Sequence, residues 1–71
     1  METLDTLLKG KKTGFFENDN GEYCQINRNS ETIKVIFSKG LGEISERGII
    51  KTDSEQKVIE LIKEDRFVLI D

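Results

Sequence analysis

The sequence predicts a small α+β domain, in which a C-terminal helix packs on an antiparallel sheet and a short helix precedes the sheet. Three observations predict this fold. An Asn20-Gly21 turn signal separates two apolar segments, and residues 31–37 alternate between apolar and polar side chains. Residues 48–70 read as strand, capped amphipathic helix and strand. A chain of 71 residues is expected to form one domain, residues 1–71.

The composition indicates a thin core and a mildly acidic surface. Only 35% of the residues are hydrophobic, so burial barely offsets the entropy of ordering, and we expect a protein partner or a homo-oligomer to help. The net charge is −3, and all of the acidic excess falls in residues 41–71. This balance argues against a general nucleic-acid binder, which needs a basic footprint.

Residues 1–10 are predicted to form a short N-terminal helix. Leu4, Leu7 and Leu8 are spaced at i, i+3 and i+4, and Gly10 is placed to end the helix. A helix this short is unstable alone, so the leucines must dock either on the domain's own sheet or on another chain. We therefore take these three leucines as candidate protein-binding residues.

A small basic cluster follows the predicted helix. It consists of Lys9, Lys11 and Lys12. Such a cluster is typically a solvated helix end, and the alternative is a contact to a phosphate or to an acidic partner.

Residues 14–27 are predicted to form a β-hairpin. With Asn20 and Gly21 at the centre of a two-residue turn, Phe15 faces Ile26 across the two strands.

The same register places Phe16 and Tyr23 on the opposite face of the hairpin. Both faces then carry an aromatic residue, so either neighbouring elements cover both or one is partly exposed to a partner. Phe16 and Tyr23 are the hairpin's candidate protein-binding residues. Cys24, the only cysteine, is expected to be a small core residue, since no histidine is present to activate it as a nucleophile.

A third strand is predicted from Glu31 to Phe37, where Ile36 interrupts the polar side of the alternation. It completes an antiparallel meander. Residues 38–47 are the least determined segment. Their Lys-Gly-Leu-Gly run is expected to be a flexible turn rather than a nucleotide-binding loop, and residues 43–46 a turn or one exposed strand edge.

The final segment predicts a helix over residues 53–64 and a strand over residues 66–70. Thr52 is the expected N-cap, and Glu55 would complete a capping box three residues later. The predicted core gathers apolar side chains from the sheet, the C-terminal helix and the last strand: Phe15, Ile26, Ile33, Val35, Phe37, Ile49, Val58, Leu61, Ile62, Val68 and Ile70.

The residues that usually carry chemistry are scarce. The chain has no histidine and one cysteine, so we expect no metal site, no cofactor and no enzymatic activity. No apolar stretch approaches the ~20 residues that cross a bilayer, and no signal-peptide pattern begins the chain. A cytoplasmic location is the expectation.

Residues 35–65 resemble a pattern in small bacteriophage proteins. There, a strand ending in F-x-x-G is followed by a G-x-[YFI]-x-T-[DE] run and a short charged helix. The corresponding stretches are Phe37-Ser38-Lys39-Gly40 and Gly48-Ile49-Ile50-Lys51-Thr52-Asp53, with the helix from Ser54. The resemblance implies a virion-associated or accessory protein that binds other proteins, located in the host cytoplasm or the virion, and it brings no catalytic residues.

The leading functional prediction is a non-enzymatic protein–protein interaction module, encoded by a phage or mobile element. One alternative is an inhibitor of a host enzyme or defence system that acts through the acidic region 43–65. Another is a weak single-stranded nucleic-acid binder that uses the hairpin aromatics, including Tyr23, with a set of basic residues: Lys9, Lys11, Lys12 and Arg28.

Overall fold

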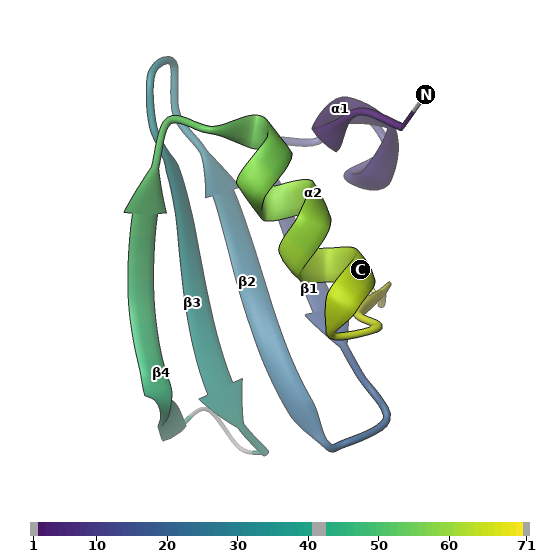
Figure 1. The fold of residues 1–71 in the computed structure, drawn as a ribbon, viewed down its shortest axis with the longest axis vertical. Coiled ribbons are helices and arrows are strands. Elements are labelled where there is room, and N and C mark those ends of the chain that lie inside the picture. Colours follow the sequence, from purple (N-terminus) through teal and green to yellow (C-terminus); the bar gives the residue numbers. More distant parts are fainter. Residues whose placement is uncertain (1, 41–42, 71) are drawn as a thin grey trace.

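The computed structural model describes residues 2–40 and 43–70, and it confirms the α+β class. The elements follow one another along the chain in this order: α1 (Leu4–Leu7), β1 (Thr13–Glu17), β2 (Glu22–Arg28), β3 (Ile33–Lys39), β4 (Glu43–Thr52), α2 (Glu55–Glu64) and β5 (Val68–Leu69) (Figure 1).

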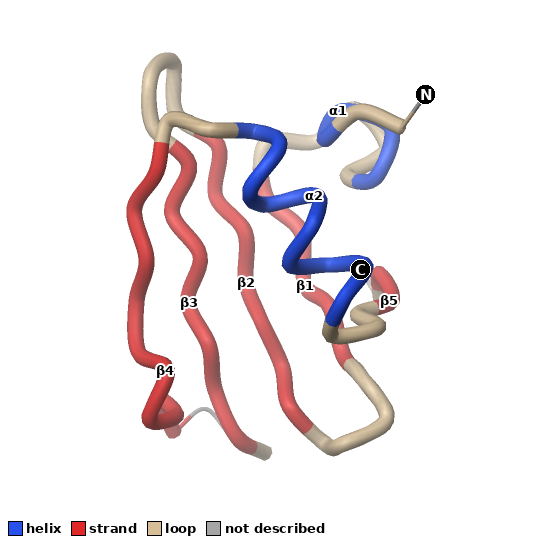
Figure 2. The backbone as a smooth tube through the Cα atoms, viewed as in Figure 1, coloured by secondary structure: helices blue, strands red, loops and turns tan. Residues whose placement is uncertain are grey.

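The strands form one antiparallel sheet in the order β4-β3-β2-β1-β5. Helix α2 leaves the β4 edge, crosses one face of the sheet and delivers the chain to β5 at the other edge (Figure 2). Helix α1 packs on this same face, because Leu4 and Leu8 join the core cluster of the sheet and α2. We call this side of the sheet the helix face and the opposite side the open face.

The hairpin turn differs from the prediction by one residue. Asn18 N donates to the Glu22 carbonyl (3.0 Å), and Gly21 N donates to the Asn18 carbonyl (3.2 Å). The loop therefore has three residues, 19–21, and ends on Gly21 with φ +75°. Phe15 consequently pairs with Gln25 and not with Ile26.

This shift exchanges the two faces of the first strand, because side chains alternate with a period of two. Phe16 lies inside and Phe15 outside. The core residues come from the helix face and both helices: Leu4, Leu8, Phe16, Cys24, Ile26, Ile33, Val35, Phe37, Val58, Ile59, Ile62 and Phe67.

Five predicted core positions are corrected. Phe15, Ile49, Val68 and Ile70 are exposed, and Leu61 is only partly buried. The last strand is also shorter than predicted, although Ile70 N still donates to the Phe15 carbonyl (2.8 Å).

Helix α2 begins later than predicted. Its N-cap is Ser54, whose hydroxyl accepts from Lys57 N (3.3 Å). Thr52 instead accepts from Ser54 N (3.0 Å), so it shapes the turn before the helix. The Glu55 carboxylate closes no capping box but accepts from Leu4 N (3.3 Å), which ties α1 to α2.

Helix α1 docks on the domain's own core. Thr3 is its N-cap, and both Leu4 and Leu8 are fully buried. Leu8 lies so close to Gly14 that a Cβ atom at this position would collide with the leucine side chain. Glycine at position 14 therefore allows the side chain of Leu8, the C-cap of α1, to pack directly against β1.

Strand β4 begins at Glu43, within the segment 38–47 that the sequence left undetermined. Residues 43–46 therefore form part of an edge strand and not a turn. A large bulge interrupts it, since Phe37 alone on β3 faces residues 45–48 on β4. Gly48 supplies the positive φ of +69° that the bulge requires. Leu41 and Gly42, from the predicted flexible turn, lie outside the described residues.

Candidate binding surface

The open face carries an apolar patch that no described element covers. The exposed members of the patch are 43–65% exposed: Phe15, Ile44, Ile49, Val68 and Ile70. Tyr23 and Ile36 are partly buried. Because contiguous apolar surface is uncommon on a monomer, this patch is the strongest candidate for a functional surface. The open-face patch consists of Phe15, Tyr23, Ile36, Ile44, Ile49, Val68 and Ile70.

Strand register makes the patch continuous. Phe15, Gln25, Ile36 and Ile49 lie directly opposite one another across β1 to β4. Ile70 extends this row beyond β1, through its backbone hydrogen bond to Phe15. An apolar band thus runs across the sheet, interrupted only by the amide of Gln25.

Polar residues border the band on both sides. The row nearer the start of β1 holds Thr13, Asn27, Lys34 and Lys51, which are mutual cross-strand neighbours. On the other side Glu17 faces Tyr23, and its carboxylate raises the pKa of the Tyr23 phenol through a hydrogen bond and its charge. An apolar centre with a polar rim is the usual arrangement of a protein interface.

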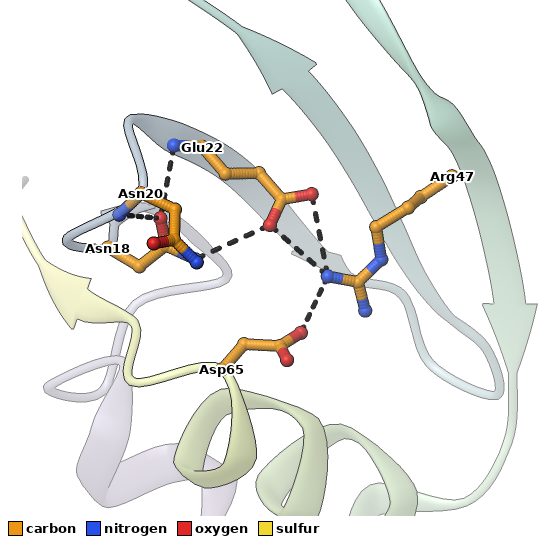
Figure 3. Close-up of polar contacts among 5 residues, drawn as sticks. All are labelled: Asn18, Asn20, Glu22, Arg47 and Asp65. Carbon is orange, nitrogen blue, oxygen red and sulfur yellow. Dashed lines mark hydrogen bonds and ion pairs between the residues drawn. The ribbon is translucent and has the colours of Figure 1, made fainter.

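A polar network lies on the helix face, next to the end of α2 (Figure 3). Arg47 reaches from the β4 bulge over the Phe37 ring, 4.1 Å from its centroid, and pairs with Asp65 at 2.6 Å and Glu22 at 3.2 Å. Partial burial lowers the pKa of Arg47, but the two carboxylates outweigh it and the net shift is upward. Arg47 thus links the β4 edge, β2 and the end of α2.

The buried Asn18 extends this network into the hairpin loop. Its Oδ1 accepts from Asn20 N (3.1 Å) and from Glu22 N (3.0 Å), and its Nδ2 donates to Glu22 Oε1 (3.3 Å). The polar groups of the network bind one another within the domain, and we therefore assign the network a structural role.

Two groups of the acidic region 43–65 are also engaged internally. Asp65 pairs with Arg47, and Glu55 accepts from Leu4 N. Part of the charge that an inhibitor would direct at a basic partner therefore stabilises the fold.

Cys24 lies on the helix face and is 1% exposed. Burial, followed by the charge of Glu22, raises the pKa of its thiol to about 12. The thiol stays protonated near neutral pH, which agrees with the predicted role of a small core residue.

Some of the predicted protein-binding residues are buried in the core, and others are partly exposed. Leu4, Leu8 and Phe16 are fully buried, so in this fold their side chains cannot contact a partner, and that prediction is corrected. Leu7 is half-buried against the core, and Tyr23 lies on the open face.

Sequence reasoning missed most of the patch, although one signal pointed to it. Ile36 stands where the alternation of β3 calls for a polar residue, and it lies at the centre of the apolar band. An apolar residue on the outward side of a strand is therefore the informative deviation here.

The predicted nucleic-acid set is not brought onto one surface. Tyr23 lies on the open face near one end of β2, whereas Arg28 lies at the other end with the opposite side-chain direction. Lys9, Lys11 and Lys12 are exposed before β1. Lys12 is nevertheless adjacent to Arg28, because Arg28 N donates to the Lys12 carbonyl (2.7 Å).

Comparison with protein-family models, with curated proteins and with solved structures found no match to this chain. The resemblance to small bacteriophage proteins stays a prediction. Within residues 2–40 and 43–70, no helix is both long and apolar enough to cross a membrane. In the same residues, no group of three or more acidic, histidine or cysteine side chains is arranged to hold a metal ion.

Proposed function

We propose that this protein is a non-enzymatic protein-binding module that docks through the open face of its sheet. The observation that carries the proposal is the uncovered apolar band centred on Phe15, Ile36 and Ile49. Both helices pack on the other side, so the domain completes its core without covering this band. Burying it would contribute ~25 cal/mol per Å² of apolar surface removed from water.

The rim defines the kind of partner. A complementary protein surface is apolar at its centre, because the exposed band lies along one face of a sheet. It carries acidic groups opposite Lys34 and Lys51 and a basic group opposite Glu17. An accessory role in a phage or mobile element is consistent with such a module, and it rests on the resemblance of residues 35–65 alone.

The test compares a face variant with a matched control. Phe15→Ser/Ile49→Ser removes two exposed residues from the patch, whereas Ile50→Ser removes an isoleucine of similar exposure whose side chain is on the helix face. Each tagged protein is used to capture partners from an extract of the source cells. Light scattering measures the mass of the purified protein in parallel, because a second copy of the chain would also satisfy the proposal.

We expect the wild type and Ile50→Ser to retain the same partner or the same dimer, and the double variant to lose it. Circular dichroism should show that all three are folded. Equal capture by the double variant would contradict the proposal. So would a strictly monomeric wild type that retains no partner.

A further inference from the structure

A depression of about 620 Å³ lies on the molecule away from the open-face patch, where the chain enters β1 and leaves β2. Five residues line it, and two of them are cationic: Gly10, Lys12, Arg28, Asn29 and Ser30. No carboxylate is among these lining residues. On a protein of net charge −3, such a concentration of positive charge is a local feature and not a consequence of overall composition.

Backbone contacts hold the two cationic residues side by side. Arg28 N donates to the Lys12 carbonyl (2.7 Å), just beyond the last paired residues of β1 and β2. Asn29 N donates to the Thr32 carbonyl (2.8 Å), which fixes the turn that carries Ser30. The polar side chains therefore come from a rigid strand end and a closed turn.

The guanidinium of Arg28 is only partly satisfied. Nη1 lies 3.2 Å from Asp5 Oδ1, and Nη2 donates to the Lys11 carbonyl. Nε is buried and has no hydrogen-bond partner within the described residues. A buried donor without an acceptor is costly, and arginine donors match the oxygens of phosphate particularly well.

We propose that this depression binds a phosphate group. Lys12 and Arg28 supply the charge, and the Ser30 hydroxyl and Asn29 amide supply further hydrogen-bond donors. The same group could belong to inorganic phosphate or to the phosphodiester of a single strand, and the chemistry of the site is shared by both. This site is separate from the open-face patch, so the two proposals stand or fall independently.

Substitution of Asp5 should affect anion binding in the opposite direction to substitution of Lys12. The Asp5 carboxylate is 3.2 Å from Arg28 and its side chain is 70% exposed, so it competes with an incoming anion for the same guanidinium. Removing the charge of Asp5 should therefore tighten anion binding, whereas removing the charge of Lys12 should weaken it.

The experiment is a titration of the full chain with inorganic phosphate at low ionic strength, followed by amide NMR shifts. A second titration uses a short oligothymidylate. The variants are Lys12→Gln, Asp5→Asn and, as a matched control, Lys39→Gln at the opposite end of β3. Arg28 is left intact because it also holds the Lys11 carbonyl.

We expect saturable shifts at Lys12, Asn29 and Ser30. Lys12→Gln should weaken binding up to about fivefold, and Asp5→Asn should tighten it by a similar factor, as partly exposed ion pairs allow. Lys39→Gln should leave the affinity unchanged. Site-specific binding of either probe supports the proposal, and the probe that binds identifies the source of the phosphate. Absence of saturable shifts with both probes, or equal effects of Lys12→Gln and Lys39→Gln, would overturn it.

Discussion

The two faces of the sheet are built from the same strands with alternating side chains, yet one face is buried and the other is exposed. On the helix face, Phe16, Ile26 and Phe37 are at most 1% exposed beneath α1 and α2. On the open face, Phe15 and Ile49 are 43% and 47% exposed. Apolar residues on both sides of a strand thus do not identify the core. The side on which the helices pack identifies the core, and the described elements leave the other side uncovered.

The largest expected effect separates two adjacent phenylalanines. Phe16→Ala should lower the free energy of unfolding by about 3–5 kcal/mol, because it leaves a cavity under the helices. Phe15→Ala removes a half-exposed ring and should cost roughly 1 kcal/mol. Chemical denaturation of both variants measures the difference.

The same pair of variants tests the three-residue loop. A two-residue turn at Asn20-Gly21 would place Phe15 inside and Phe16 outside. A larger loss for Phe15→Ala than for Phe16→Ala would therefore reject the observed register, and with it the assignment of the open face.

Because Cys24 is buried on the helix face, the stability of the protein should depend on pH in alkaline solution. The Cys24 thiol has an ordinary pKa of 9.0, which burial raises to about 12 in the folded protein. Between these values the unfolded chain has released a proton that the folded chain retains. Stability therefore falls as the pH rises, by up to ~1.4 kcal/mol per unit.

Comparing the wild type with Cys24→Ala isolates this contribution, since the two proteins share all their other side chains. The stability of the wild type should fall more steeply above pH 9.0 than that of the variant. Parallel curves would mean that the thiol is not buried on the helix face.

The smallest effect concerns the start of α2, the helix that covers the helix face. Ser54→Ala should cost about 1 kcal/mol, because it removes the acceptor for Lys57 N. Thr52→Ala should cost roughly 0.5 kcal/mol, because its hydroxyl accepts from Ser54 N before the helix begins. Thermal melts compare the two variants, and a larger loss for Thr52→Ala would place the cap where the sequence predicted it.

The sequence by itself determined the elements. Alternation over residues 31–37, the apolar stripe of α2 and the Asn20-Gly21 signal each depend on neighbouring residues, and each corresponds to an element of the structure. The docking of the N-terminal leucines was left open between the sheet and another chain, and they dock on the domain's own core. The Ile36 deviation marked the open face, but nothing local said how it should be interpreted.

Only the tertiary structure decided which face is the core. Glycine at position 21 suits a two-residue and a three-residue loop equally well, since both need a positive φ there. The buried side chain of Asn18, bonded to Asn20 N and Glu22 N, accompanies the longer loop. Burial of Phe16 beneath α1 and α2 fits that register. The core that Phe16 shares with Leu4, Val58 and Ile62 joins residues far apart in the chain, and so no local pattern contains it.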